Sequence, residues 1–283
     1  MSKHVGVIGI GIMGGGMARR LLTTGHTVVL FNRTAERTAP LVALGAEAAA
    51  SPAALAAKVE VIITVVRDDA ALRSVILGPQ GALGAARPGT TFIECSTVSP
   101  AVIQEVGAAV EARGCHFLDA PVTGSKVAAE SGKLGFLMSG RQEVLESQRD
   151  LLSTLGQSVS YFGPLGKSAT FKLANNQLAA VLVRAMGESL ALCEAAGLDR
   201  ATVVEALVTT ATRVCGLKKE KLLKRDWSTD FALSLMLKDI DLVLSTAAQL
   251  NVAMPQLAAA REIYQRAEAR GAGELDFAAV AEP

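Results

Sequence analysis

Hydrophobic residues follow two different patterns along the chain. Before residue 164, short apolar runs typical of buried strands alternate with stretches whose apolar residues recur at helical spacing. We expect strands at 5–9, 27–31, 60–66, 91–94, 115–119, 134–139 and 158–161, and helices that include 13–24 and 141–155. Strands that alternate with helices predict an α/β fold with a mostly parallel sheet, which binds ligands at the carboxyl ends of its strands.

After residue 164 the strand pattern stops and only helical spacing remains. The first expected helix would be about 44 Å long at about 1.5 Å per residue, which exceeds what one small domain needs. We therefore expect it to join two domains, 1–164 and an all-helical 165–283. The helices expected in this half are 167–196, 200–212, 215–225, 233–250 and 254–271.

Composition excludes several classes of protein. Half of the 283 residues are hydrophobic and 19% are charged, which is ample for a core and unlike a disordered chain. The net charge of +1, without a dense basic patch, gives no support for nucleic-acid binding. No apolar run reaches the length of a membrane span, and the N-terminus lacks a small-residue cleavage site. Scattered cysteines predict reduced thiols, no metal site and a cytoplasmic location: Cys95, Cys115, Cys193 and Cys215.

The segment after the first expected strand has the spacing of a dinucleotide-binding turn. Gly9, Gly11 and Gly14 give G-x-G-x-x-G, in the order strand, glycines, helix, strand. The first glycine allows the tight turn, the second lets the backbone approach a pyrophosphate, and the third lets helix pack on strand. The N–H groups at the helix start, around Ile12 and Met13, favour phosphate oxygens. We expect a nicotinamide cofactor to bind at these five residues.

The residues after the second expected strand indicate which cofactor binds. NAD enzymes usually place Asp or Glu there to hold the ribose hydroxyls, whereas this chain has Asn32, Arg33 and Thr34. Arg33 offers a planar cation with several donors for a 2′-phosphate, and Thr34 offers a hydroxyl. This favours NADP(H). The alternative is that Arg33 is a solvated loop residue.

Five segments in order are typical of one family of enzymes. They are VGVIGIGIMGGGMARRLL, CSTVSP, DAPVTGSKVAAESG, GKSATFKLANN and LKDIDL. Together they resemble the β-hydroxyacid dehydrogenases, which include 3-hydroxyisobutyrate dehydrogenase, tartronate semialdehyde reductase and glyoxylate/succinic semialdehyde reductase. The resemblance covers nearly the whole chain. It implies a Rossmann-type doubly wound, mostly parallel sheet, followed by an all-helical C-terminal domain, with a long interdomain helix between them.

The same resemblance implies a reaction and its proton donor. NADPH would deliver hydride to the aldehyde carbon of a small aldehyde acid, and Lys172, which matches the catalytic lysine, would protonate the oxygen. Asn176 matches its companion, and residues four apart project from one face of a helix. Apolar neighbours would desolvate Lys172 in part, which favours proton transfer by an amine. Taken alone, Lys172 would more often be a surface lysine near a helix start, since structural lysines outnumber catalytic ones.

The remaining site residues also follow from the resemblance. Successive N–H groups and two hydroxyls at 123–125 make an anion-binding concavity that suits a substrate carboxylate. Lys238 matches a lysine at the mouth of the site, although it could be a solvated helix residue, and Asp239 is expected to cap or pair. The substrate-contacting residues would be Ser96, Thr123, Gly124 and Ser125, and the further cofactor-contacting residues Val65, Val66, Thr97 and Lys238.

Two departures from the family bear on the substrate. Many members have Ser-Gly-Gly where this chain has Thr-Gly-Ser at 123–125, and the glyoxylate/succinic semialdehyde branch has Ser-Gly-Ser. Arg67 stands where a neutral residue is common. Oxidation of 3-hydroxyisobutyrate and reduction of imines remain alternatives, although imine reductases generally lack the lysine. A non-catalytic NADP-binding protein would not need Lys172, Asn176 and the 123–125 loop together.

The expected partners are a small carboxylate-bearing substrate and further copies of the chain. The helices at 233–250 and 254–271 have broad apolar faces, which a small helical domain does not bury alone. Family members associate through this half. We therefore expect a homodimer or homotetramer, with no nucleic-acid or membrane partner.

Overall fold

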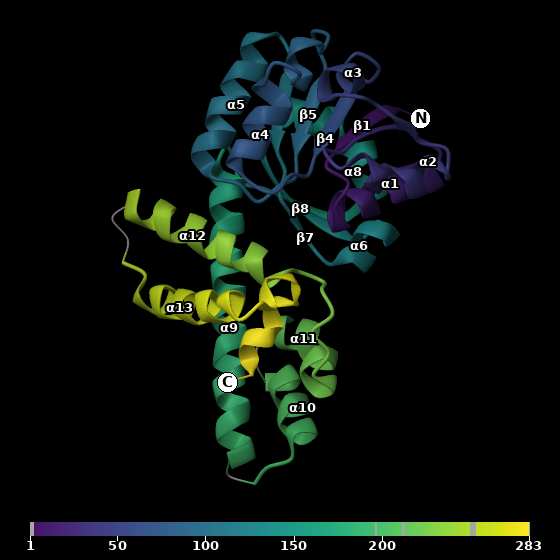
Figure 1. Ribbon diagram of the computed structural model, residues 1–283. Coiled ribbons are helices and arrows are strands. Elements are labelled where there is room, and N and C mark those ends of the chain that lie inside the picture. The colour runs from purple at the N-terminus through teal and green to yellow at the C-terminus, as the bar shows by residue number, and fades with distance from the viewer. Residues whose placement is uncertain (1–2, 196, 211–212, 250–252, 283) are drawn as a thin grey trace. The chain divides into compact units, whose positions relative to one another are not determined.

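The computed structural model describes residues 3–195, 197–210, 213–249 and 253–282, which form two compact units (Figure 1). The units are Met1–Lys172 and Leu173–Pro283, and helix α9 (Lys167–Ala195) runs through the division. The expected domain boundary at residue 164 stays a prediction. Three helices were expected to end at residues 196, 212 and 250, which lie outside the described residues.

The first unit is built on a mostly parallel sheet. Its described strands run in the order β3-β2-β1-β4-β5-β6-β8-β7, and β9 also pairs with β8. Strand β8 is antiparallel to β6 and β7, while the other pairs are parallel. The bounds are β1 His4–Ile8, β2 Thr27–Phe31, β3 Glu47–Ala48, β4 Val61–Thr64, β5 Thr91–Glu94, β6 His116–Asp119, β7 Val122–Thr123, β8 Leu134–Gly140 and β9 Gly156–Tyr161.

Helices cover both faces of this sheet, as Figure 1 shows. Successive strand residues belong to opposite cores: Ile63 packs with one helix layer and Ile62 with the other. The first layer contains α1 (Ile12–Thr23), α2 (Ala39–Val42), α6 (Lys126–Ser131), α7 (Gln142–Ser147) and α8 (Arg149–Leu155). The second contains α3 (Pro52–Ala56), α4 (Asp69–Leu77) and α5 (Pro100–Ala112). The expected doubly wound fold is confirmed.

Two local features differ from the pattern-based expectation. The single helix expected at 141–155 was wrong, because the chain leaves helical geometry at Gln148 and forms α7 and α8. The buried side chain of Gln148 accepts a hydrogen bond from Nζ of Lys3 at 2.8 Å, a contact between residues far apart in sequence. Strands β3 and β7 were missed because two residues are too short to show alternation.

The second unit is helical, as expected. Around its apolar core it contains α10 (Arg200–Thr210), α11 (Arg213–Lys224), α12 (Leu233–Gln249), α13 (Pro255–Ala269), the 3₁₀ turns η3 (Ala272–Glu274) and η4 (Phe277–Ala281), and most of α9. The core includes Tyr264, whose side chain is fully buried.

One buried carboxylate of this unit holds two buried lysines. Asp276 is fully buried, and its Oδ2 accepts from Nζ of Lys218 at 2.9 Å and from the N–H of Phe231 at 3.2 Å. Its Oδ1 accepts from the N–H of Ala278 at 3.0 Å. Nζ of Lys221 lies 3.9 Å from the same carboxylate. Asp276 therefore ties α11, the segment before α12 and η4 together.

We predict that Asp276→Ala lowers the free energy of unfolding by about 3–5 kcal/mol, because it leaves Lys218 buried without its carboxylate. Urea denaturation measures this loss. Glu220→Ala is the control, since it breaks an exposed pair with Lys224 and should leave the urea midpoint unchanged. Equal midpoints for the two variants would contradict the prediction.

Candidate functional site

The glycine turn lies where the strand order reverses, between β1 and β4. Ligands of doubly wound sheets bind in the crevice at such a point. Gly9 has φ of +98°, and a Cβ on it would lie 2.0 Å from the carbonyl oxygen of Val65. A Cβ on Gly14 would lie 2.0 Å from the carbonyl oxygen of Gly9. Only glycines allow β1, α1 and β4 to approach this closely.

The start of α1 is suited to a phosphate. Gly11 is the N-cap, and among the described residues no atom lies within 4 Å of the position that its Cβ would take. The first turn contains no acidic residue. Ile12 is exposed, whereas Met13 packs against the core. The N–H groups and the helix dipole of this open turn therefore favour an anion.

Asn32 shapes the neighbouring loop. Its Oδ1 accepts from the N–H of Ile10 at 2.9 Å, and its Nδ2 donates to the carbonyl oxygen of Thr34 at 2.8 Å. The side chain thus connects the ends of β1 and β2. Arg33 and Thr34 are exposed beside it, with no carboxylate at 32–34. The contacts of these three residues with a cofactor stay predictions.

A buried carboxyl joins the ends of β4 and β5. Glu94 is fully buried; its Oε1 accepts from the N–H of Ser96 at 2.7 Å, and its Oε2 is hydrogen-bonded to the hydroxyl of Thr64. Oγ of Ser96 accepts from the N–H of Val66 at 2.7 Å. Ser96 and Val66, two expected site residues, are therefore held together. Val65, Val66 and Thr97 are half-buried beside this network.

A second buried carboxyl fixes the start of α9. Oδ2 of Asp119 accepts from the N–H groups of Gly166 and Ala169, both at 3.1 Å. Oγ of Ser168 donates to the carbonyl oxygen of Asp119 at 3.0 Å. Lys172 follows one turn later and is half-buried. The end of β6 thereby fixes the first turn of the helix that carries Lys172.

Both carboxyls titrate near neutrality. Burial raises the pKa of Glu94 to about 7, against hydrogen bonds from Ser96 and Thr64 that lower it. Burial also raises the pKa of Asp119 to about 6, against hydrogen bonds from Ser168, Ala169 and Gly166. The charge of Asp119, the register partner of Glu94 on the next strand, adds to the rise at Glu94. The pair therefore carries less than its full negative charge near pH 7.

The loop expected to hold a carboxylate lies between β7 and α6. Gly124 has φ of +127°, which favours glycine, and Ser125 is the N-cap of α6. Oγ1 of Thr123 donates to the carbonyl oxygen of Gly135 at 3.4 Å. Helix α6 packs against α1, the helix of the glycine turn (Figure 1). The anion-binding role of the loop stays a prediction.

Asn176 belongs to a buried polar group of the second unit. Its Nδ2 donates to Oδ2 of Asp239 at 2.5 Å, and Oδ1 of Asp239 lies 2.9 Å from Nζ of Lys238. Asn176 is 7% exposed and Asp239 1%. An ionised carboxylate only accepts hydrogen bonds, so the amide of Asn176 must present its nitrogen to Asp239. Its amide oxygen remains for another donor.

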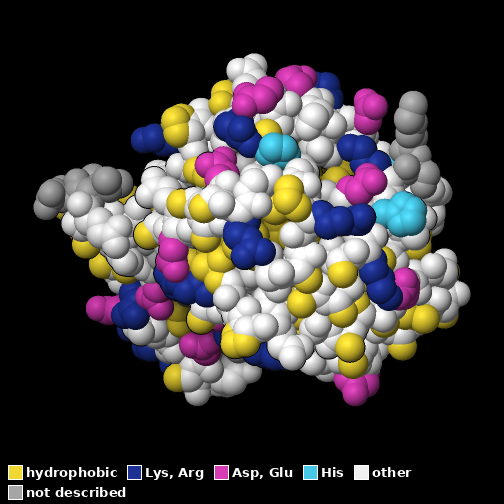
Figure 2. All heavy atoms as spheres, turned by 90° about the horizontal axis from the view of Figure 1, so that it is seen from above, with side chains coloured by type: hydrophobic (Ala, Val, Ile, Leu, Met, Phe, Trp, Pro, Cys, Tyr) yellow, Lys and Arg dark blue, Asp and Glu magenta, His cyan; other side chains and the backbone are white. Residues whose placement is uncertain are grey.

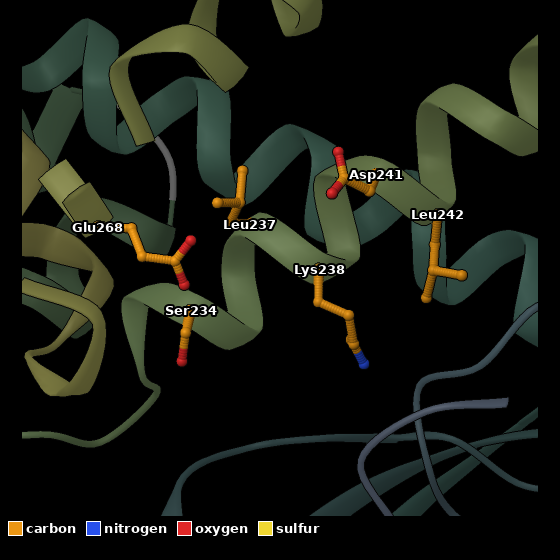
Figure 3. Close-up of a pocket in the computed structure, with 6 residues that line it drawn as sticks. All are labelled: Ser234, Leu237, Lys238, Asp241, Leu242 and Glu268. Atoms are coloured by element: carbon orange, nitrogen blue, oxygen red, sulfur yellow. The ribbon is translucent and has the colours of Figure 1, made fainter. Parts of the chain in front are cut away.

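Lys238 also lines a cavity of about 340 Å³. Figure 3 shows its side chain projecting from α12 beside that of Ser234, one turn earlier. The other lining residues are Leu237, Asp241 and Leu242 from the same helix and Glu268 from α13. The expected contact of Lys238 with cofactor or substrate stays a prediction.

Other classes of site have little support among the described residues. No group of three His, Cys, Asp or Glu side chains there could hold a metal ion. None of the helices described is long and apolar enough to cross a bilayer. On the face drawn in Figure 2, basic and acidic side chains are interspersed.

Comparisons with known proteins identify the family. The NAD binding domain of 6-phosphogluconate dehydrogenase matches residues 4–163, and the NAD-binding domain of NADP-dependent 3-hydroxyisobutyrate dehydrogenase matches residues 166–283. A probable mitochondrial 3-hydroxyisobutyrate dehydrogenase-like protein of Arabidopsis thaliana is 33% identical over 97% of this chain and 83% of its own. The chain belongs to the β-hydroxyacid dehydrogenase family. Its first unit is a Rossmann-type domain for a nicotinamide cofactor.

Other members of the family differ in length and name. Chloroplastic glyoxylate/succinic semialdehyde reductase 2 of Arabidopsis thaliana is 33% identical, over 98% of this chain and 78% of its own. The cytokine-like nuclear factor N-PAC of Xenopus tropicalis is 31% identical over 98% of this chain, which spans about half of that relative (52%). A 3-hydroxyisobutyrate dehydrogenase structure from Salmonella typhimurium superposes with a TM-score of 0.89, at 29% identity and 99% coverage of both chains.

Glu94 should make the stability of this protein depend on pH. Its pKa is about 7 in the fold against the ordinary glutamate value of 4.5, so the folded protein binds the extra proton between these values. The stabilisation that this proton gives the folded state is fully present below the unfolded-state pKa and is lost as pH rises through the folded-state pKa. Relative to Glu94→Gln, we expect the free energy of unfolding of the wild type to fall from about pH 5 to about pH 8. Urea titrations across this range measure the difference, and a constant difference would contradict the prediction.

Proposed function

We propose that the protein is an NADPH-dependent reductase of small aldehyde acids, such as glyoxylate, succinic semialdehyde or tartronate semialdehyde. The observation that carries the proposal is the position of Lys172 and Asn176 on one face of the continuous helix α9, four residues apart. The half-buried lysine follows a helix start that Asp119 fixes. The substrate classes follow from family resemblance and from the names of relatives.

The first unit fits a nicotinamide cofactor. Gly9 and Gly14 let β1, α1 and β4 approach closely, and the open helix start at Gly11 leaves room for a pyrophosphate. Exposed Arg33 and Thr34, without a carboxylate beside them, support a 2′-phosphate and hence NADPH. When bound, the cofactor supplies the hydride, and the chain supplies position and charge.

Protonation of the substrate oxygen would be the task of Lys172. Its ammonium group would donate the proton as negative charge develops on that oxygen. Asn176, whose nitrogen donates to Asp239, would orient Lys172 or the substrate carbonyl. The N–H groups and hydroxyls of 123–125 would hold the substrate carboxylate. The hydroxyl of Ser96 accepts from the N–H of Val66 and is hydrogen-bonded to Glu94, so its contact with substrate remains an expectation from the family resemblance.

A second candidate is oxidation of 3-hydroxyisobutyrate. The match of residues 166–283 to the NAD-binding domain of NADP-dependent 3-hydroxyisobutyrate dehydrogenase favours it. It uses the same residues with Lys172 as proton acceptor. Imine reduction shares only the fold, since the imine reductase structure from Pseudomonas is 22% identical. Self-association and the cytoplasmic location remain predictions.

The test of function is turnover with a panel of substrates. We expect NADPH oxidation with at least one of glyoxylate, succinic semialdehyde, tartronate semialdehyde and methylmalonate semialdehyde. Lys172→Ala should lower kcat by about 10²–10⁴-fold while the NADPH Kd is unchanged. Lys172→Arg should fail as well, because guanidinium keeps its proton.

The control for this test is Lys167→Ala, an exposed lysine at the start of the same helix, which should keep wild-type kcat. If folded Lys172→Ala retained activity within about tenfold of wild type, another group would be the proton donor. If the wild type bound NADPH but turned over none of the aldehydes, nor 3-hydroxyisobutyrate, the protein would be a binding protein instead.

Arg33→Ala should weaken NADPH binding by roughly 1.5–3 kcal/mol and leave NADH binding unchanged, because only NADPH carries the 2′-phosphate. Isothermal titration calorimetry with both cofactors measures this. Arg19→Ala, an exposed arginine on α1, is the control for the lost positive charge. A wild type with equal or higher kcat/KM for NADH would refute the preference.

A further inference from the structure

The carboxyl ends of three neighbouring strands carry a row of buried polar side chains. Thr64, Glu94 and Asp119 are register partners across β4, β5 and β6, and they are 1%, 0% and 0% exposed. A carboxyl without contact with water costs stability unless its hydrogen bonds are complete. Glu94 is fully buried and cannot contact a ligand, so any part that it plays in binding must act through the residues around it.

Glu94 closes a ring of hydrogen bonds between two loops. One carboxyl oxygen accepts from the N–H of Ser96, and the other is bonded to the Thr64 hydroxyl. Ser96 returns to the first loop by accepting from the N–H of Val66. The N–H of Cys95 donates to the carbonyl oxygen of Thr64 at 2.8 Å and strengthens the ring. Residues 64–66 and 94–96 are thus fixed as one body.

This body contacts the glycine turn. The carbonyl oxygen of Val65 lies 2.0 Å from the position that a Cβ on Gly9 would take. The N–H of Val65 donates to the carbonyl oxygen of Ile8 at 2.8 Å. Val65 is therefore held against the turn by backbone contacts that do not involve the side chain of Glu94.

The strand order decides which half of a dinucleotide these loops face. Strand β2, with Arg33 at its end, lies on one side of β1, and β4 and β5 lie on the other. A pyrophosphate over the glycine turn would direct its adenosine toward β2. The nicotinamide half would then lie over the ends of β4 and β5.

We propose that Glu94 is a positioning residue, whose carboxyl group holds the loops after β4 and β5 in the conformation that binds the nicotinamide half of the cofactor. The inference rests on the proposed function only in that a nicotinamide cofactor must bind to the first unit. It requires no particular substrate and no particular proton donor.

Substitutions at Glu94 can separate hydrogen bonding from size. In Glu94→Gln, Oε1 can accept from Ser96 and Nε2 can donate to a rotated Thr64 hydroxyl. Methionine has a similar length but offers neither bond. Glutamine should therefore keep the loops in place, and methionine should release them.

The experiment compares a whole cofactor with a fragment that lacks the nicotinamide half. Calorimetry with NADPH and with adenosine 2′,5′-bisphosphate gives Kd values for the wild type, Glu94→Met and Glu94→Gln. In Glu94→Met, we expect the NADPH Kd to rise about tenfold or more and the fragment Kd to stay within about twofold. In Glu94→Gln both should stay near wild type. NADH and ADP form the corresponding pair if the wild type prefers NADH.

Two further variants make the test robust. Thr64→Val removes the hydroxyl bonded to Glu94 and should raise the NADPH Kd about two- to fivefold without changing that of the fragment. This variant replaces Glu94→Met if Glu94→Met does not fold. Glu60→Gln changes an exposed carboxylate at the other end of β4 and should leave both Kd values unchanged.

Three results would overturn the inference. The first is an unchanged NADPH Kd in folded Glu94→Met, or in Thr64→Val where that variant replaces it. The second is an equal rise in the Kd values of NADPH and of the fragment. The third is a rise in the NADPH Kd of Glu94→Gln equal to that of Glu94→Met. Each leaves the proposed function intact if the wild type still binds and turns over NADPH. A wild type that binds neither cofactor would instead refute the proposed function, and this inference with it.

Discussion

Two buried carboxyl groups fix the edge of the sheet at which the cofactor is expected to bind. Glu94 joins the ends of β4 and β5, and Asp119 joins the end of β6 to the first turn of α9. Each group is fully buried, so its hydrogen-bond donors must come from the chain itself. The chain supplies a partner to both oxygens of Glu94 but only to Oδ2 of Asp119, whose Oδ1 is buried without a hydrogen bond among the described residues. The free energy spent on burial thus produces defined loops.

Much of the fold could be predicted from sequence because its signals are local. Runs of apolar residues gave the longer strands, and the glycine turn was recognisable because Gly9 and Gly14 have no room for a Cβ. The break at Gln148 could not be predicted, since it accompanies a contact with Lys3 at the other end of the first unit's sequence. Strands of two residues left no periodicity to detect.

The candidate site was predictable in part, for the same reason. The cofactor turn follows from spacing, but the role given to Lys172 came mainly from family resemblance, and its contacts with ligands stay predictions. Glu94 reads in the sequence as the acid that ends a strand, because nothing local reveals that it is buried. The bond that fixes the amide of Asn176 comes from Asp239, 63 residues away. Sequence distance hides such partners.

The carboxylate of Asp276 also has a consequence for synthesis of the chain. Lys218 leaves the ribosome well before Asp276, which lies 58 residues later. Until then, Lys218 and Lys221 lack their buried partner, and their ammonium groups must stay hydrated. The described strands of the first unit all precede Lys218 in the chain, whereas α11 cannot settle into its final core before Asp276 is made. An unfinished chain therefore has every described strand of the nucleotide-binding unit but lacks the carboxylate around which the helical unit closes.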